Sequence, residues 1–295
     1  MIPMKIHRVS LVPGGALEYA LLMHPAPIAL SRRAFVGLLP SACILSGEST
    51  KLTDAEQETF LRNAKVVRTR AAGVGITGSR RATLSDGPLT HDAHIQVIDE
   101  AKAIFQGTGG TEMNFRDTWK FNIAAYRLDR LLGLQMTPVS AERRFEGKAG
   151  SFTWWVDDVL MMELDRHKKK IKAPDAERWN CQMHVVRIFD QLICNVDRNL
   201  QNLLITKNWD LWMIDHTRAF RLHKKVIAPK NVERCDRKFL ARLKELDRAT
   251  LRETLQPYVN PMEIDGLLGR RDHIVQLLES NIQKLGEANV LYDRP

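Results

Sequence analysis

Three polar residues that stand between apolar runs have the types and spacing needed for chemistry on a nucleotide. Asp197 and Asn202 are five positions apart, and Asp215 follows the strand-like run 211–214. Mg²⁺ prefers oxygen ligands, so an Asn amide and an Asp carboxylate, completed by phosphates and water, can hold it. A carboxylate that binds no metal can accept a proton from an attacking hydroxyl. The pattern predicts Asn202 and Asp215 as metal ligands and Asp197 as the base. The competing interpretation is that these residues only form turns.

The residues and spacing of these motifs resemble those of the atypical protein kinases. The string from Asn195 to Asn202 is NVDRNLQN, and Asp215 stands in the triplet Ile-Asp-His. Both are similar to motifs of HipA-like, phosphatidylinositol-kinase-like and secretory-pathway (Golgi casein kinase-type) kinases. The resemblance implies an α+β, two-lobed protein-kinase-like fold, with a small antiparallel β N-lobe that holds one helix and a mainly helical C-lobe. It also implies ATP and Mg²⁺ as cofactors, and it makes Asp197, Arg198 and Asn202 the catalytic residues.

A glycine-rich segment lies between two expected strands, 65–69 and 80–84. It carries Gly73, Gly75 and Gly78 in the pattern G-x-G-x-x-G. A dinucleotide site requires a helix after this pattern, and the expected strand excludes that reading. Strand, glycine loop and strand is the kinase arrangement over the ATP phosphates, where backbone N–H groups can approach the anion. The three glycines are therefore predicted to bind the cofactor, although a turn of no function is the alternative.

The charged pair that holds the ATP phosphates in most kinases is replaced in this alignment. A strand expected at 93–98 places Gln96 at the usual lysine, and a helix expected at 115–132 places Asn122 at the usual glutamate. Gln96 facing Asn122 would replace an ion pair by a neutral hydrogen bond, and both are predicted to lie at the cofactor. Residues that could supply the missing cation are Arg80, Arg81 and Lys120, of which Arg81 is included among the predicted cofactor-binding residues.

The remaining segments predict the supports of this site. Thr53 with Glu56 predicts a capping box that starts a helix. Residues 134–146 and 151–156 predict a long hairpin that leads into the hinge, and an apolar stripe over 179–193 predicts a helix that delivers the chain to Asp197. The expected domains are an N-lobe at 51–158 and a C-lobe at 159–295.

Composition narrows the partners. The chain has 295 residues, 44% of them hydrophobic, and a formal net charge of +9. That charge favours acidic partners, such as nucleotides or an acidic phosphoacceptor. None of the known nucleic-acid-binding motifs occurs in the sequence, so no nucleic acid is expected. No membrane span is expected in the mature chain, because the apolar run 34–45 is too short to cross a bilayer.

Residues 1–50 read differently from the rest. Arg32 and Arg33 precede the apolar run 34–45, a pattern similar to a twin-arginine export signal that starts at Met23. This interpretation predicts export to the periplasm or the extracellular space. The alternative is a disordered or amphipathic arm on a cytoplasmic protein.

These patterns together predict an ATP- and Mg²⁺-dependent phosphotransferase that acts on a hydroxyl of a protein or a small molecule, with Asp197 as base. Two alternatives stay open. The neutral residues Gln96 and Asn122 favour a pseudokinase that binds nucleotide or a partner without transfer, and rearranged phosphate contacts would suit transfer of AMP.

Overall fold

The structure, a computed structural model, describes residues 52–72, 79–107, 110–195 and 198–294. The predicted export segment, the three glycines Gly73, Gly75 and Gly78, and the predicted base Asp197 lie outside these residues. Within the described part, none of the helices is long and apolar enough to cross a membrane.

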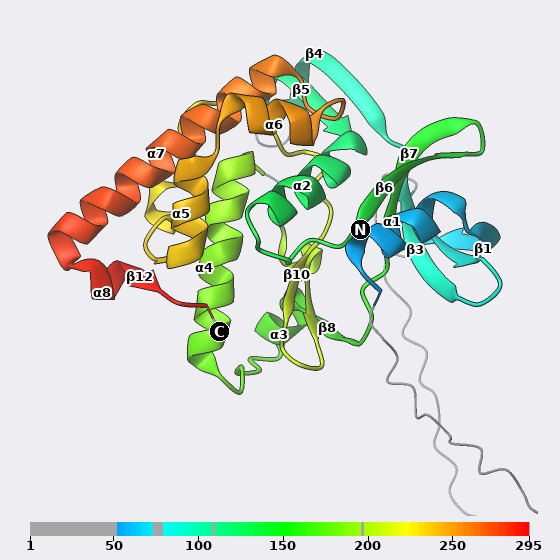
Figure 1. Ribbon diagram of the computed structural model, residues 1–295, viewed down its shortest axis with the longest axis horizontal. Helices are drawn as coiled ribbons and strands as arrows, with labels where there is room; N and C mark the ends of the chain where they lie inside the picture. Colours follow the sequence, from blue (N-terminus) through cyan, green and yellow to red (C-terminus); the bar gives the residue numbers. More distant parts are fainter. Residues whose placement is uncertain (1–51, 73–78, 108–109, 196–197, 295) are drawn as a thin grey trace, which may run out of the picture. The chain divides into compact units, whose positions relative to one another are not determined.

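A five-stranded antiparallel sheet lies at one side of the described part of the molecule (Figure 1). Its strands, in spatial order, are β1 (Lys65–Ala71), β2 (Arg80–Ser85), β3 (Thr90–Gln96), β7 (Lys148–Trp154) and β6 (Ser140–Phe145). Helix α1 (Asp54–Asn63) begins with the predicted capping box, in which the Thr53 and Glu56 side chains each accept a backbone N–H. Leu61 of this helix packs with Leu84, Ile95 and Phe152 of the sheet in one hydrophobic cluster. Because α1 packs against one face of the sheet, the sheet is a stable support for the residues on its other face.

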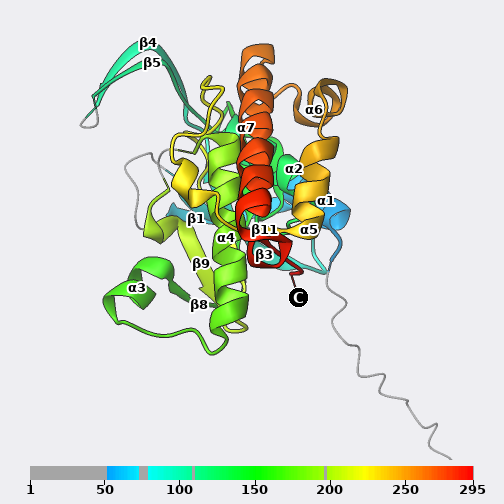
Figure 2. The ribbon, with the colours of Figure 1, turned by 90° about the vertical axis from the view of Figure 1, so that its left-hand side faces the viewer.

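Helix α2 (Lys120–Leu131) forms within the predicted range 115–132 and buries an apolar face, with Phe121, Ala125 and Leu128 fully buried. The predicted start at residue 115 is wrong, because 115–118 are extended and belong to a hairpin. That hairpin, β4 (Asp99–Gly107) with β5 (Gly110–Thr118), projects from the body of the described chain (Figure 2). The third strand of the large sheet also starts earlier than predicted, at Thr90 instead of residue 93.

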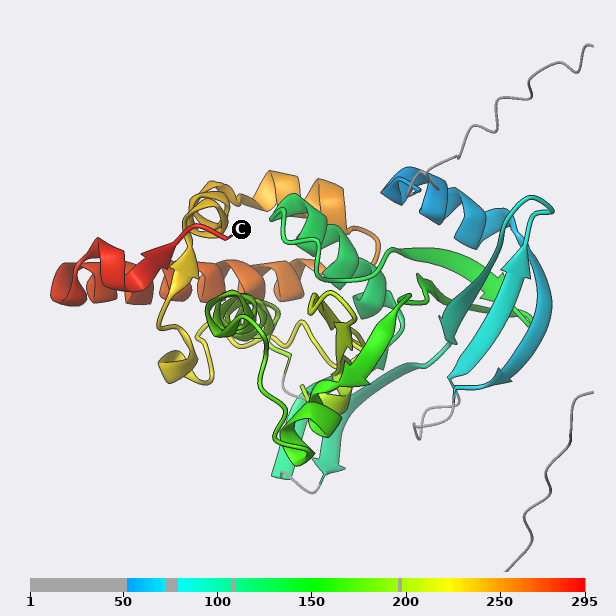
Figure 3. The same ribbon diagram turned by 90° about the horizontal axis from the view of Figure 1, so that it is seen from below.

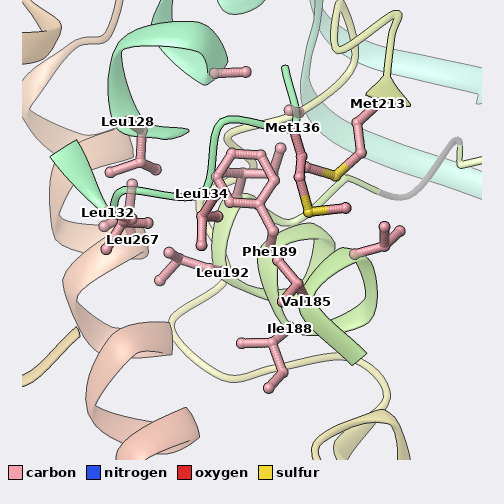
Figure 4. Close-up of a cluster of buried hydrophobic side chains, with 14 of the residues drawn as sticks. Leu128, Leu132, Leu134, Met136, Val185, Ile188, Phe189, Leu192, Met213 and Leu267 are labelled. Carbon is pink, nitrogen blue, oxygen red and sulfur yellow. The ribbon is translucent and has the colours of Figure 1, made fainter. Parts of the chain in front are cut away.

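The opposite side of the described part of the molecule is mainly helical, as Figure 3 shows for α4 and α7. Its helices are α3 (Glu163–Lys168), α4 (Ala176–Ile193), α5 (Arg237–Glu245), α6 (Arg248–Leu255), α7 (Pro261–Leu285) and α8 (Glu287–Val290). A three-stranded sheet of β10 (Leu211–Met213), β9 (Leu203–Thr206) and β8 (Val159–Met162) lies beside α4, and short strands β11 (Cys235–Asp236) and β12 (Leu291–Tyr292) pair near the C-terminus. The large core joins α2, α4, α7 and β10; Figure 4 labels Leu128, Phe189, Met213 and Leu267 among its members.

The predicted long hairpin is shorter than expected. Its first strand begins only at Ser140, because the preceding backbone is bound to neighbouring segments. The buried carboxylate of Asp129 accepts the N–H groups of Gln135 and Met136, and the Met136 carbonyl accepts the N–H of Met213 at 2.7 Å. These bonds hold the segment between α2 and β6 in place beside β10.

Arg270 of α7 is a fully buried cation. It binds backbone carbonyls of α4 and of the segment that follows Asp215, a predicted metal ligand. Its guanidinium donates to the carbonyl of Leu192 at 2.8 Å, to that of Arg221 at 2.7 Å and to that of His223. Burial lowers the pKa of Arg270 to about 10. The side chain therefore satisfies carbonyls from two segments that would otherwise be buried without partners.

We expect Arg270→Leu to lower the free energy of unfolding by about 3 kcal/mol or more, because three carbonyls, two of them in buried hydrogen bonds, lose a charged donor. Arg248→Ala removes an exposed arginine of the same chain, paired with Asp265, and should change stability by less than about 0.5 kcal/mol. Urea unfolding of both variants checks this. Equal stability of the two variants would contradict the role given to Arg270.

Candidate active site

A cleft of about 220 Å³ lies between the five-stranded sheet and the β8–β10 sheet. One part of its lining is apolar. It comes from the segment after β7, with Trp155 and Val156, and from β9 and β10, with Leu204 and Met213. The other part is polar and comes from β3, α2 and the loops around β9 and β10: His94, Gln96, Asn122, Asn202, Asp215 and His216. Of the predicted site residues that the structure describes, Gln96, Asn122, Asn202 and Asp215 thus share one cavity.

Asn202 and Asp215 are held close together by their backbones. Asn202 ends a 3₁₀ turn that is capped by the Asn199 side chain, which accepts the N–H groups of Gln201 and Asn202. The Asn202 carbonyl then accepts the N–H of Ile214 at 3.0 Å, which places Asp215 next in the chain. The short turn and the β9–β10 hairpin therefore place both residues at the same cleft, although they are thirteen positions apart in the sequence.

The donor set of Asn202 and Asp215 fits a hard divalent cation. Asp215 is exposed to the cleft, and its carboxylate accepts a hydrogen bond from the Thr217 hydroxyl at 3.2 Å. Within the described part of the chain, no hydrogen bond occupies the side-chain amide of Asn202. An amide oxygen and a carboxylate at the edge of a solvent-accessible cleft suit Mg²⁺ or a similar ion, which would complete its shell with water and phosphate.

Arg198 lies beneath these two residues. Its guanidinium makes a paired contact with the Asp190 carboxylate and donates to the carbonyls of Asn202 at 3.0 Å and Ile214 at 2.6 Å. It also donates to Nε2 of His216 at 2.9 Å. These bonds hold the backbone on which Asn202 and Asp215 stand, and the catalytic role that the sequence gives to Arg198 stays a prediction.

Gln96 and Asn122 occupy the cleft, but their described hydrogen bonds go to other groups than the sequence suggested. The side-chain carbonyl of Gln96 accepts the N–H groups of Val97 and Ile98. The Asn122 amide donates to the Ser151 hydroxyl at 3.3 Å, and its oxygen accepts the N–H of His216 at 2.9 Å. The neutral pair therefore supports backbone at the two sides of the cleft. The neutral substitute for the ion pair that the sequence suggests stays a prediction.

The three basic residues considered as substitutes for the lysine are engaged elsewhere. Arg80 pairs with Glu146, Arg81 with Asp92, and Lys120 with Asp99. Arg81 contacts a residue that lines the cleft, because its guanidinium stacks 4.0 Å from the ring centroid of Trp155. None of the three lines the cavity, and the described lining residues include no lysine or arginine.

Two lining residues escaped the sequence analysis. His94 lies on the same face of β3 as Gln96, two positions away, so strand alternation was the signal that could have found it. Burial lowers the pKa of His94, while the negative charge of Asp215 opposes this shift. Thr137 is buried, and its hydroxyl has no hydrogen-bond partner among the described residues. No sequence pattern marks Thr137.

Comparison with known proteins identifies the fold. No protein-family model matches this chain, and no curated protein sequence does. The structure is similar to that of hydra Fam20 with sugar, with a TM-score of 0.61 and 17% identity over 81% of this chain and 92% of that one. It is also similar to the Golgi casein kinase, with a TM-score of 0.57 and 14% identity over 82% of this chain and 78% of that one. The structure of that kinase with Mn/ADP bound gives the same score and identity, and 80% of that chain is covered.

These similarities establish an atypical kinase-like fold. The chain has the α+β, two-lobed architecture that its motifs predicted, and that prediction is confirmed. In this fold the five-stranded sheet with α2 is the N-lobe and the helical part is the C-lobe, so the cleft lies between the lobes.

We expect the protein to lose stability as the pH falls below about 6.5, partly because of His216. Burial, and next the charge of Arg198, hold the pKa of His216 well below its usual 6.5. The unfolded chain therefore binds a proton at His216 that the folded chain refuses, and each pH unit below 6.5 costs up to about 1.4 kcal/mol until the folded pKa is reached.

Urea unfolding at several pH values checks this expectation. His216→Gln should make the dependence on pH less steep below pH 6.5, and the exposed control His223→Gln should keep the wild-type slope. Because burial also lowers the pKa of His94 and His184, some slope remains in every variant. An unchanged slope in His216→Gln would contradict the assignment.

Proposed function

We propose that this chain is a phosphotransferase that uses ATP and a divalent cation, Mg²⁺ by preference, to phosphorylate a hydroxyl group. The observation that carries the proposal is the meeting of Asn202 and Asp215 at the polar side of a cleft whose other side is apolar. A nucleotide has the same division, with a flat base and a charged phosphate chain. The kinase-like fold supports the proposal because the cleft lies between its two lobes.

The apolar residues would receive the base. Trp155 and Val156 follow β7, and Leu204 and Met213 lie on β9 and β10 below them. Apolar walls with few polar groups suit a planar base, since they remove its faces from water while its edge finds hydrogen bonds. The buried Thr137 hydroxyl is one group that could supply such a bond.

The polar residues would hold the phosphates and the cation. Asn202 and Asp215 would ligate the ion, which supplies charge compensation for the phosphoryl group when bound. Asp197, outside the described residues, is the base that the sequence proposes for the acceptor hydroxyl, and Gly73, Gly75 and Gly78 are the proposed phosphate cradle. Arg198 would keep the backbone of both metal ligands in place through its bonds to the Asn202 and Ile214 carbonyls.

The acceptor is proposed to be a protein or a small molecule that is acidic. The chain has a net charge of +9, and an exposed run of His223, Lys224 and Lys225 follows the segment that starts at Asp215. Positive charge close to a site raises the local concentration of acidic substrates.

A pseudokinase is the second candidate, and a specific observation favours it. The described lining of the cleft offers no lysine or arginine to the phosphates. Gln96 and Asn122, which the kinase resemblance places at the usual ion pair, are both neutral. Loss of a cation from such a site reduces stabilisation of the transferring group more than it reduces binding of the base. Transfer of AMP instead of phosphate is a third outcome, if the phosphates lie in another orientation.

Nucleotide binding is the first expected result. ATP with Mg²⁺ at about 100 times its dissociation constant should stabilise the wild type by about 2.7 kcal/mol, a rise in melting temperature of roughly 5–10 °C. Asp215→Ala should lose the metal-dependent part of this rise. Asp272→Ala, an exposed carboxylate on α7, should keep it. No shift in the wild type at any nucleotide concentration would exclude the nucleotide proposals.

The transferred group is decided by intact mass spectrometry after incubation with ATP, Mg²⁺ and a panel of acidic proteins. The proposal predicts a gain of one phosphoryl group on an acceptor, and Asp197→Asn should abolish it while ATP binding persists. A gain of one AMP supports the third outcome. Nucleotide binding without transfer to any acceptor favours the pseudokinase.

A further inference from the structure

The backbone on either side of Asp215 is held from two directions. Before Asp215, the carbonyl of Ile214 accepts a hydrogen bond from Arg198 at 2.6 Å. After it, the N–H of His216 donates to the side-chain oxygen of Asn122 at 2.9 Å. Arg198 belongs to the loop that carries Asn202, whereas Asn122 belongs to α2 of the N-lobe. The two peptide groups that set the direction of the Asp215 carboxylate are thus fixed by both lobes.

This support meets a local need. Asp215 has a φ of 56°, in the left-handed region that residues other than glycine seldom adopt. Such a conformation persists where the surrounding structure holds it in place, and it is common at functional sites. The contact between Asn122 and His216 acts on the peptide bond directly after the strained residue, so it bears on where the carboxylate points.

The N-lobe reaches the same segment through two further contacts. The N–H of Thr118 donates to the Thr217 carbonyl at 2.9 Å, and Asp117 forms an ion pair with Arg218 at 2.9 Å. Both residues lie directly before α2. The start of α2 and residues 216–218 therefore form one connected unit, in which Asn122 binds the residue directly after Asp215.

The neutrality of Asn122 also follows from its surroundings. The side chain is only 7% exposed. A glutamate here would bury a negative charge, and Gln96 provides no positive charge to pair with it. Burying an unpaired carboxylate is costly, whereas an amide oxygen accepts the same backbone hydrogen bond without that cost.

We infer that Asn122 is a positioning residue of the metal site: it holds the Asp215 peptide in the orientation that binds a cation, in place of pairing with a phosphate-binding lysine. The inference rests on the proposed function for the identity of the cation, but the contact itself is independent of any nucleotide. Through this uncharged hydrogen bond, the position of α2 sets the orientation of Asp215, the proposed metal ligand.

The test uses the full chain and three variants. Asn122→Leu has nearly the same size but no acceptor. Asn122→Ala also removes the acceptor and leaves a smaller side chain. Ser151→Ala is the matched control, because it removes the other described partner of Asn122 and leaves the bond to His216 intact. Circular dichroism first establishes that each variant is folded.

The first measurement is hydrogen–deuterium exchange at the His216 amide, without nucleotide or metal. We expect exchange at least tenfold faster in Asn122→Leu and in Asn122→Ala, and close to wild type in Ser151→Ala. Wild-type exchange in both Asn122→Leu and Asn122→Ala, or equally fast exchange in all three variants, would overturn the inference. If Asn122→Leu fails to fold, the comparison of Asn122→Ala with Ser151→Ala decides it in the same way.

The second measurement is the affinity for Mn²⁺ in the presence of saturating ADP, followed by the electron paramagnetic resonance signal of free Mn²⁺. Loss of a group that orients a metal ligand typically weakens metal binding about tenfold or more. We expect that loss in Asn122→Leu, unchanged affinity for ADP without metal, and wild-type values in Ser151→Ala. Equal Mn²⁺ affinity in Asn122→Leu and wild type would overturn the inference. Failure of the wild type to bind ADP and Mn²⁺ would instead reject the proposed function, and the exchange measurement would still decide the role of Asn122.

Discussion

The geometry of the cleft depends on how the peptide groups around Asp215 are held. An aspartate in the left-handed region has no intrinsic preference for staying there, so its carboxylate points into the cleft only while neighbouring groups fix the backbone. Arg198 fixes the carbonyl before Asp215 and also the carbonyl of Asn202, so one guanidinium sets the relative position of both proposed metal ligands. Asp190 in turn neutralises this guanidinium through a paired contact. The metal pair is therefore the outer part of a buried polar network that extends from α4 to α2.

The second constraint is the cost of burying charge. A lysine and a glutamate facing each other in the cleft would each have to be removed from water, and each would be costly if the other were absent. This chain has neutral residues at both places, and the structure gives each of them backbone groups to bind. The replacement is thus consistent as a pair, whereas either change alone would leave a buried charge without a partner. In the proposed phosphotransferase, charge compensation on a bound phosphate would therefore depend more heavily on the cation proposed at Asn202 and Asp215.

Much of the fold could be read from local sequence patterns. The Thr53–Glu56 capping box, the apolar faces of α2 and α4, and the strand before Asp215 are encoded by neighbouring residues, and the kinase-like motifs added the arrangement of the lobes. The β4–β5 hairpin was missed because β4 is exposed on both faces and lacks the alternation of a half-buried strand. The contacts of His216 with Arg198 and with Asn122 could not be predicted, since they join residues 18 and 94 positions apart. Gln96 and Asn122 were found by alignment alone, but their hydrogen-bond partners required the structure.

The central claim is that Asn202 and Asp215 together ligate the cation of a bound nucleotide. Crystals of the protein grown with ADP and Mn²⁺, and measured at a wavelength where manganese scatters anomalously, test it most directly. The account predicts an anomalous peak at ligand distance, roughly 2.2 Å, from the Asn202 amide oxygen and an Asp215 carboxylate oxygen, with the ADP phosphates on the opposite side of the ion. A nucleotide bound in the cleft with no manganese at these two residues, or with manganese held elsewhere, would contradict it.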